Sequence, residues 1–476
     1  MFDVAIIGAG VTGAHVAREL TRRSFSVCLL EKADDLCMGA SKANSAIVHA
    51  GFDARSGSMK ARLNVRGCAL MPQVARELAV PYKNIGSLVL AFSEAERKTL
   101  NELLGRGQKN GVPELEIIDG ERLFEREPQI SHEAVAALWA PTAGIVCPFE
   151  LTLAAAENAV QNGAVFKRGF DVIAAKSDES GLTLIAKSGE TVRARLAVNA
   201  AGAYADQVAM LFGDKTIKLE PRRGQYHLFD KIANDKANSV LFQCPTKAGK
   251  GILVTQTVHG NLLIGPSMEV TEPDDTATQS AVLNKVLEVA RKSIPDLNSR
   301  EIITSFAGLR AHEKGHDLVV GFSKANVRLY HTAGIESPGL SAAPAVGEYA
   351  AEEIAKRLGA APRDDFDPIR KTVPLFSSLK KAEQAALAKA NPDYGRIVCR
   401  CETVTRGDIL AALHSTIPAV DIDGLKRRVR PTMGRCQGGF CGSICAEILA
   451  DELGVPLTEI TKFGGESKLL TGRLDT

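Results

Sequence analysis

The side chains best suited to metal or redox chemistry gather near the C-terminus, which holds half of the chain's ten cysteines. Cys399 and Cys401 form a C-x-C pair, and Cys436 and Cys441 form a C-x4-C pair further along. Four thiolates in two close pairs form the ligand set of a [2Fe-2S] cluster or of a tetrahedral zinc site. Zinc sites usually favour C-x2-C spacing, so the residues alone leave both centres, and unligated thiols, open. Cys445 lies one helical turn after Cys441, and we expect it to pack rather than to bind metal.

The N-terminus carries a second pattern with chemical meaning, "VAIIGAGVTGAHVARELTRR" (4–23). An apolar strand is followed by Gly8, Gly10 and Gly13 in G-x-G-x-x-G spacing and then by a helical pattern. These glycines permit a tight turn, a close approach to a pyrophosphate, and close packing of helix on strand. A second strand, "SVCLLE" (26–31), ends in Glu31, an acid placed to bind a ribose hydroxyl. The context predicts a dinucleotide site rather than a ligand-free glycine turn, but it does not separate FAD from NAD.

Three segments downstream narrow the choice: "GASKANSAIVHAGFD" (39–53), "RLAVNAAGAYADQVA" (195–209) and "LYHTAGIESPGLSAAPAVGEYAAEEI" (329–354). The second is an apolar strand that runs into small residues, as expected where backbone passes close to a cofactor. The third is a strand, a glycine and proline turn, and a helix start. The N-terminal amides of that helix can face the electron-rich pyrimidine of a reduced flavin.

In this order behind the glycine motif, the segments resemble the D-amino-acid oxidase superfamily of FAD enzymes, especially its glycerol-3-phosphate dehydrogenase and L-2-hydroxyglutarate dehydrogenase branches. The similarity covers roughly residues 1–360 and implies an α/β fold. A Rossmann-type FAD domain would be built from about 1–80, 145–215 and 325–360, and an inserted antiparallel-sheet substrate domain from about 81–144 and 216–324. The FAD contacts that the resemblance implies are Gly8, Gly10, Thr12, Gly13, Glu31, Ser41, Asn44, Ser45, Gly202, Gly334, Gly339 and Leu340.

The same resemblance points to catalytic and substrate-binding residues. His49, in "AIVHAGF", stands where the resembled dehydrogenases carry a histidine near the isoalloxazine, and we expect it to act as general base or to polarise the substrate. A structural histidine and covalent attachment of the flavin are the alternatives. Arg310 follows a G-x-R turn, and we expect it to act in catalysis by binding a carboxylate or phosphate; a salt bridge is its alternative.

Two adjacent arginines in "EPRRGQYHLF" (220–229) are further candidates. Neighbours on a strand face opposite ways, so one of Arg222 and Arg223 should face the substrate. We assign Arg223 to the substrate, although the strand argument leaves the choice open. The remaining histidines of this half are expected to be surface or core residues, with His312 able to share the face of Arg310: His227, His259, His312 and His316.

The C-terminal segment, with "GRCQGGFC" (434–441), resembles the bacterioferritin-associated-ferredoxin-like [2Fe-2S] domain that ends some glycerol-3-phosphate-dehydrogenase-like flavoproteins. This implies a small all-α domain at 395–460, with Cys399, Cys401, Cys436 and Cys441 as ligands of a [2Fe-2S] cluster. Residues 361–394 read as a connector and 461–476 as a tail that docks on the body. The basic run of Lys426, Arg427, Arg428 and Arg430 is expected to be a solvated face, or else to offset the charge of the cluster.

Composition bounds the partners and the location of the protein. The net charge of +2 offers no field for a polyanion, so we expect no nucleic-acid partner. The N-terminus lacks the pattern of an export signal, and no run of 18 apolar residues is present, so we expect no transmembrane segment. A cytoplasmic protein, attached to a membrane at most through a partner, is the prediction.

Together these features predict a dehydrogenase with two cofactors, FAD and a [2Fe-2S] cluster, acting on a small anionic substrate. By resemblance the substrate is sn-glycerol 3-phosphate and the product dihydroxyacetone phosphate. No second G-x-G-x-x-G follows a strand, so electrons are expected to leave through the cluster to a partner protein or carrier. The alternatives are L-2-hydroxyglutarate or another 2-hydroxy acid, a secondary amine or imino acid, an oxygen-using oxidase with a zinc-bound structural module, and a non-catalytic electron-transfer subunit.

Overall fold

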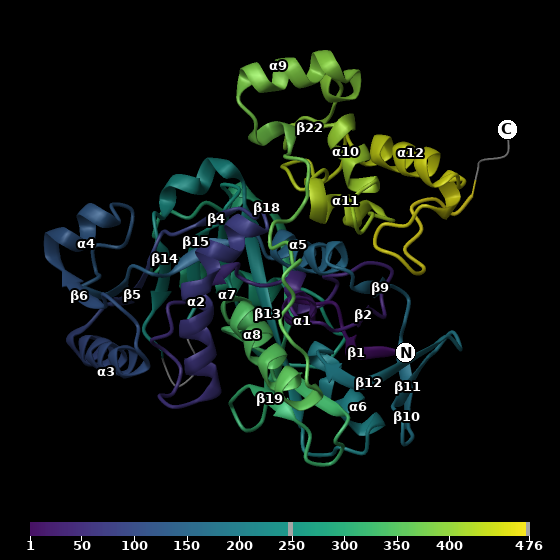
Figure 1. The fold of residues 1–476 in the computed structure, drawn as a ribbon. Helices are drawn as coiled ribbons and strands as arrows, with labels where there is room; N and C mark the ends of the chain where they lie inside the picture. Colours follow the sequence, from purple (N-terminus) through teal and green to yellow (C-terminus); the bar gives the residue numbers. More distant parts are fainter. Residues whose placement is uncertain (246–250, 473–476) are drawn as a thin grey trace.

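The N-terminal strand lies inside a mixed sheet (Figure 1), where it runs parallel to both of its neighbours. The computed structural model describes residues 1–245 and 251–472. The strand is apolar throughout its buried part, as expected for parallel strands; Val4, Ala5 and Ile6 are inaccessible to solvent. The sheet runs β10 (Val172–Ser177), β11 (Leu182–Ala186), β12 (Thr191–Asn199), β1 (Phe2–Ile7), β2 (Val27–Leu30) and β9 (Val165–Lys167), with β20 (Leu329–Ala333) beside β12 and β19 (Val319–Phe322) beside β20.

Helices from distant parts of the sequence pack together on one face of this sheet. α1 directly follows the glycine turn and contacts α5 and α8, and α8 in turn contacts α2. Their small residues allow this close packing; a Cβ on Gly347 would lie 2.7 Å from the carbonyl oxygen of His15. The helices of this domain are α1 (Val11–Thr21), α2 (Met59–Glu77), α5 (Pro148–Gln161), α6 (Ala205–Leu211) and α8 (Gly339–Leu358).

A second, larger sheet forms the inserted domain. It is antiparallel except where β5 and β14 run in parallel. Its order is β17 (Glu269–Val270), β13 (Leu219–Phe229), β16 (Leu262–Gly265), β15 (Leu253–Gln256), β14 (Val240–Gln243), β5 (Ser87–Ala91), β7 (Ala136–Ala140) and β6 (Glu116–Asp119), with β18 (Ile302–Glu313) paired to β13. Its helices are α3 (Glu94–Asn110), α4 (Gly120–Arg126) and α7 (Ser280–Ala290).

The domain boundaries differ from the sequence-based ones at two places. β19 was expected in the substrate domain, but it pairs with β20 and extends the first sheet. A small third sheet, β3 (Ile47–Val48), β8 (Gly144–Val146) and β4 (Tyr82–Lys83), joins segments that were divided between the two domains. Such long-range pairing leaves no mark in the local apolar pattern, so the sequence could not assign these strands.

The C-terminal module has its own apolar core, in which Leu425, Cys445 and Leu449 are fully buried. The prediction of an all-α domain is wrong, because a short antiparallel hairpin of β21 (Ile397–Cys399) and β22 (Val404–Thr405) precedes the helices. The helices are α10 (Arg406–Leu413), α11 (Ile422–Val429) and α12 (Gly442–Leu453), with α9 (Lys381–Ala390) in the preceding segment. Among the helices of the described ranges, none combines the length and the apolar character of a membrane span.

The connector (361–394) and the described part of the tail (461–472) both contact the domain built on the first sheet. Arg370 of the connector donates to the buried carboxylate of Glu157 at 2.7 Å, and the side chain of Asn162 accepts a hydrogen bond from the amide of Asp367. In the tail, the amide of Gly465 donates to Asp34 at 2.8 Å. The chain therefore crosses the body, forms the module beside α5, and returns to the body (Figure 1).

A buried ion cluster fixes the module on the body. Asp35, in the loop after β2, accepts two hydrogen bonds from Arg428 at 2.7 and 2.9 Å and one from Arg427 at 2.6 Å. All three side chains are almost completely buried. Burial would raise the pKa of Asp35, but the two guanidinium groups outweigh it and lower the pKa to about 2. The two arginines are therefore internal contacts, and the expectation that the basic run is a solvated face is wrong for them.

We expect Asp35→Asn to loosen the module, because it leaves two guanidinium groups buried without their counter-ion. Loss of one partner of a buried ion pair costs about 3–5 kcal/mol. Thermal unfolding and limited proteolysis in residues 361–394 measure the effect, and Asp451→Asn, which changes an exposed carboxylate on α12 of the module, is the matched control. Because the folded pKa of Asp35 is depressed from 3.8, its contribution should be present near neutral pH and vanish as the pH falls from about 4 to about 2. Equal stability and cleavage of the two variants would contradict this assignment.

Candidate functional site

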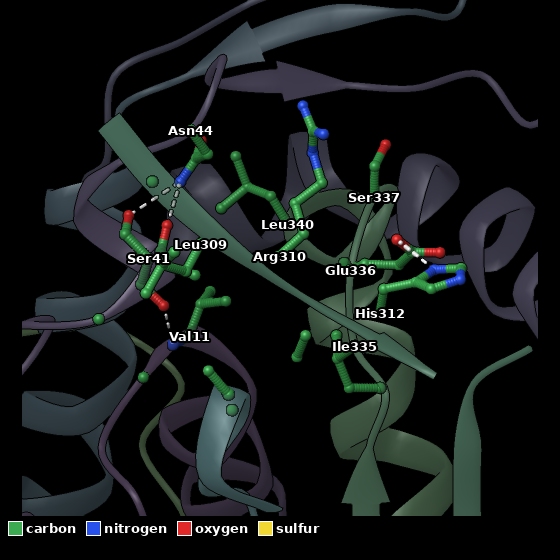
Figure 2. Close-up of a pocket in the computed structure, with 18 of the residues that line it drawn as sticks. Val11, Ser41, Asn44, Leu309, Arg310, His312, Ile335, Glu336, Ser337 and Leu340 are labelled. Atoms are coloured by element: carbon green, nitrogen blue, oxygen red, sulfur yellow. Dashed lines mark hydrogen bonds and ion pairs between the residues drawn. The ribbon is translucent and has the colours of Figure 1, made fainter. Parts of the chain in front are cut away.

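A cavity of about 1380 Å³ lies between the two large sheets and is lined by both (Figure 2). The first domain contributes the turn after β1, residues 38–55 and the start of α8, and the second contributes β13 and β18. Of the FAD contacts that the sequence implied, all but Gly13 and Gly334 line it: Gly8, Gly10, Thr12, Glu31, Ser41, Asn44, Ser45, Gly202, Gly339 and Leu340. His49, Arg310 and Arg222 line it as well, so the structure brings most of the predicted residues together.

The glycine turn has no room for side chains. Gly8 has a φ of +108°, and a Cβ there would lie 2.5 Å from the carbonyl oxygen of Ala200 at the end of β12. A Cβ on Gly13 would lie 2.0 Å from the carbonyl oxygen of Gly8, so this glycine lets α1 pack on the turn without itself reaching the cavity. Gly10 is the N-cap of α1 in extended conformation, and no side chain of its own caps the helix. Apart from the amide of Val11, which donates to Ser41, the start of α1 has no side-chain cap and can face an anionic pyrophosphate.

Glu31 directly follows β2 and lies beside the glycine turn. Its two carboxylate oxygens accept hydrogen bonds from the amides of Ala9 at 2.9 Å and Ala33 at 3.0 Å. Burial raises the pKa of Glu31, and the hydrogen bonds from the two amides act in the opposite direction. The carboxylate is thus held in place by backbone at the cavity wall, where it can accept from ribose hydroxyls.

The 39–45 segment closes the same side of the cavity. Ser41 Oγ accepts a hydrogen bond from the amide of Val11 at 2.8 Å, which ties this segment to the start of α1 (Figure 2). Asn44 donates to the carbonyl oxygens of Ala40 and Ser41 and accepts from the amide of Ala46. Ser41 and Asn44 therefore shape the backbone against which a cofactor would lie.

The opposite wall is the start of α8. Gly339 and Leu340 line the cavity at the first turn of this helix, which has no side-chain cap. Gly334 lies outside the cavity, with a φ of +64° and no room for a Cβ, which would lie 2.8 Å from the Cβ of Glu313. It turns the chain from β20 toward α8, so its role is to place the helix rather than to touch a ligand.

His49 follows β3 and is tied to α8. Its backbone amide donates to Ser341 Oγ at 2.7 Å, and its Nε2 lies 3.5 Å from Ser337 Oγ. The imidazole stacks on Phe242, with ring centroids 5.7 Å apart. The ring is therefore held between the start of α8 and the substrate sheet, at the place where the two domains meet.

Arg310 projects from β18 into the cavity between Leu340 and Ser337 (Figure 2). Its guanidinium contacts the carbonyl oxygen of Ser267 at 3.5 Å and the hydroxyl of Tyr226. Within the described ranges no carboxylate lies in ion-pair distance of Arg310, although most buried arginines of this chain have one. The cavity thus contains a cation able to accept an anionic ligand.

The assignment of Arg223 to the substrate is wrong, and Arg222 takes the place at the cavity. Arg223 is buried on the other face of β13, where it pairs with Glu269 at 3.3 Å and Asp275 at 2.6 Å. Arg222 lines the cavity and pairs with Glu220 at 2.9 Å. Arg222 and Arg223 do lie on opposite faces of β13, as expected for neighbours on a strand. Which of them faces the cavity depends on the pairing of β13 with β17 and β18, which come from distant parts of the chain.

A polar network that the sequence did not single out lines the same end of the cavity. Glu336 accepts from Lys60 at 2.8 Å and lies 3.1 Å from His312 Nδ1 (Figure 2). Burial would raise the pKa of Glu336, but the neighbouring charges of Lys60 and His312 outweigh it and lower the pKa. His316 packs on His312 and also lines the cavity. The expectation of a surface or core role holds for His227, which bonds to Ser305 and Leu283 outside the cavity. His312 lines the cavity together with Arg310, as the strand spacing allowed, and His316 lines it against expectation.

The four predicted metal ligands form two close pairs in the module. Cys401 Sγ and Cys436 Sγ are 3.8 Å apart, and Cys399 interacts with Cys441. Thiolates on one tetrahedral metal with bonds of about 2.3 Å lie about 3.8 Å apart. The amide of Phe440 is the main cause that lowers the pKa of Cys436, and the amides of Gly438 and Gly439 add to it. This chain's residues therefore fit a cluster bound by four thiolates. Cys445 is fully buried in the module core behind Cys441.

Comparison with known proteins agrees with this geometry. Residues 3–353 match the family described as DAO, FAD dependent oxidoreductase, and residues 397–451 match the BFD-like [2Fe-2S] binding domain. The chain is a member of the FAD dependent oxidoreductase family. The resemblance inferred from the sequence is confirmed, and the cofactors of this oxidoreductase are FAD and a [2Fe-2S] cluster.

Three relatives give the scale of the similarity. A glycerol 3-phosphate dehydrogenase from Caloramator mitchellensis is 45% identical, over 99% of this chain and 98% of that protein. A glycerol 3-phosphate oxidase from Mycoplasma genitalium is 32% identical, over 75% of this chain and 95% of that protein. The structure of a dithionite-reduced L-alpha-glycerophosphate oxidase from Mycoplasma pneumoniae with FAD bound has a TM-score of 0.74 at 27% identity, and covers 78% of this chain and 99% of that chain.

We expect Cys401→Ser to remove most of the iron from this oxidoreductase, because the thiolate loses its place in the ligand set. Cys445→Ser is the matched control, since that thiol lies in the apolar core behind the ligands. Iron and acid-labile sulfide should be near two of each per chain in the control and fall well below one in the variant. Zinc without iron in the unmodified protein, or loss of iron in both variants, would contradict the ligand assignment.

Proposed function

We propose that this enzyme oxidises sn-glycerol 3-phosphate to dihydroxyacetone phosphate and passes the electrons through its [2Fe-2S] cluster to a partner protein. The observation that carries the substrate is Arg310, a cation without a carboxylate partner in the described chain, in the same cavity as His49. Relatives named glycerol 3-phosphate dehydrogenase and glycerol 3-phosphate oxidase support the choice of a polyol phosphate over an amine.

The residues of the cavity have separate roles in this reaction. Arg310 binds the phosphate with charge-assisted hydrogen bonds and so fixes the distance of C2 from the start of α8. Arg222 is already paired with Glu220, so its charge is compensated before the substrate binds. The network of Lys60, Glu336 and His312 is internally satisfied, and it shapes the wall next to Ser337. Of the cations named here, Arg310 is the one without a carboxylate partner among the described residues, so it has capacity left to bind an oxyanion.

His49 accepts the proton in the proposed reaction. The C2 hydroxyl loses its proton to the imidazole while the C2–H bond breaks, and the hydride carries away the two electrons that leave as the carbonyl forms. Bound FAD supplies the two-electron acceptor for this oxidation, and the [2Fe-2S] cluster supplies a one-electron carrier. The stacking of His49 on Phe242 and its ties to α8 hold the imidazole in one orientation.

The exposure of the cysteines supports an electron exit at the module surface. Cys401 is exposed and Cys436 is half-buried, whereas Cys399 and Cys441 are buried in the module. Phe440, between two of the ligands in sequence, is 82% exposed. Exposed aromatic side chains are common anchors in protein interfaces, so this edge is suited to a transient contact with an acceptor protein.

An anaerobic flavin-bleaching screen tests the substrate. The purified enzyme is mixed with sn-glycerol 3-phosphate, L-2-hydroxyglutarate, proline and sarcosine in turn, and the flavin absorbance is followed. We expect the phosphate ester to bleach the flavin at the lowest concentration. Bleaching by L-2-hydroxyglutarate alone would reassign the substrate to a 2-hydroxy acid, and bleaching by an amine alone would overturn the reaction class. No bleaching by any of them would favour a non-catalytic subunit.

Substitution of Arg310 and His49 should separate binding from chemistry. Arg310→Gln should lower kcat/KM for glycerol 3-phosphate by roughly 10- to 100-fold, mostly through KM, because a charged hydrogen-bonding partner is lost. His49→Gln should lower kcat by about 100- to 10,000-fold with a smaller effect on KM. Arg62→Gln, on the exposed face of α2, is the control for loss of a positive charge. An unchanged KM in Arg310→Gln would remove Arg310 from the phosphate site.

A further inference from the structure

Three potential metal ligands meet outside both sites described so far. Cys147 is the N-cap residue of α5, Glu150 lies in the first turn of that helix, and His259 lies in the turn between β15 and β16. One donor atom of each lies within 4.8 Å of the others. Cys147 is 2% exposed, so its thiol is inside the protein. The cluster joins the flavin-binding domain to the substrate domain.

The donor atoms are close enough together for a single ion to contact all three. Glu150 Oε1 lies 3.2 Å from His259 Nε2, so the carboxylate and the imidazole also interact with each other. Two ligand atoms on bonds of 2.0–2.1 Å at the tetrahedral angle lie about 3.3 Å apart. The observed separation is therefore compatible with an edge of a tetrahedral site, so an ion could bind both atoms with little movement of the side chains.

The three ligand types select the class of ion. A thiolate, an imidazole and a carboxylate together suit zinc or a similar borderline transition metal, whereas magnesium and calcium prefer oxygen ligands alone. We propose that Cys147, Glu150 and His259 bind a zinc-class divalent cation, with the fourth position open to water. This site is separate from the four cysteines of the module, and it does not depend on which substrate the enzyme oxidises.

The surroundings define what such an ion would do. Arg430 and Glu402 of the module lie within electrostatic range of His259. Glu402 accepts from Arg430 at 3.0 Å and pairs with Lys231 at 3.1 Å, so one carboxylate is shared by these two cations. The ion would cross-link α5 to the β15–β16 turn beneath the module. It would thus stabilise the surface on which the [2Fe-2S] domain sits.

Metal analysis of the holoenzyme tests the proposal. The enzyme with its full complement of iron and sulfide is dialysed against Zn²⁺, freed of loosely bound metal on a desalting column, and analysed by mass spectrometry for zinc and iron. We expect about one zinc per chain in addition to the iron, and a zinc K-edge absorption spectrum that fits one sulfur and three nitrogen or oxygen neighbours.

Variants distinguish this site from others. Cys147→Ser and His259→Gln should each weaken zinc binding by roughly 100-fold or more, while the iron and FAD contents stay at the level of the unmodified enzyme. Cys244→Ser, which changes another buried free thiol in the substrate domain, is the control and should keep its zinc. Two ligand variants are used so that the test still holds if one of them fails to fold.

Three results would overturn the proposal. Absence of zinc beyond background would show that the three side chains form a polar cluster only. Zinc retained equally by both ligand variants would be an adventitious ion only. Zinc with four sulfur neighbours would place it in the cysteine module, which would instead contradict the [2Fe-2S] assignment in the proposed function, so the two failures are distinguishable.

Discussion

The buried carboxylate of Asp35 is the contact that makes one unit of the two cofactor domains. It lies four residues after Glu31, in the loop that leaves β2, and it has no access to solvent. A carboxylate so placed is costly unless its oxygens are paired, and both guanidinium groups that pair with it come from α11 of the module. The position of the module and the conformation of this loop therefore require each other.

This constraint links the ribose side of the FAD site to the iron–sulfur module. Glu31 holds the start of the loop through the amides of Ala9 and Ala33, and the amide of Cys37 at its other end donates to the carbonyl oxygen of Ala9. Both ends of the loop are thus hydrogen-bonded to the glycine turn, and Asp35 within the loop is hydrogen-bonded to Arg428 of the module. The module is therefore bound to the same stretch of backbone that shapes the cofactor site.

Several charged side chains of the cavity are paired with an opposite charge, whereas Arg310 contacts neutral groups. Glu336 is matched by Lys60 and His312, and Arg222 is matched by Glu220, so these groups are neutralised in pairs before any ligand enters. Arg310 instead contacts a carbonyl oxygen and a tyrosine hydroxyl, which are neutral acceptors. An entering oxyanion can therefore gain full charge compensation from Arg310 without displacing an existing carboxylate.

The sequence predicted best the features that depend on a few residues close together in the chain. The glycines of the first turn and Glu31 are set by local geometry, so their residue types and separations are enough. The cysteines are also close in sequence, but their contacts join Cys401 to Cys436 and Cys399 to Cys441, across the two sequence pairs. The all-α module failed because the hairpin β21–β22 is too short to leave a period-two pattern. The choice of Arg223 over Arg222 failed because the face of β13 that meets the cavity is decided by its pairing with β18.

The residues that sequence reasoning missed are paired across long separations. Lys60 and Glu336 are 276 positions apart, and Asp35 and Arg428 are 393 apart, so neither pair can be recognised from neighbouring residues. A basic run such as "KRRVR" is usually solvated, and only the buried carboxylate on the other domain reverses that expectation for Arg427 and Arg428. The same reasoning explains Cys147, Glu150 and His259, since two of them are close in sequence but the third arrives on a turn of the other sheet. Sites of this kind form where two domains meet. The sequence of one domain does not show which of its charged residues will be buried against the other, so these sites are recognised only in the structure.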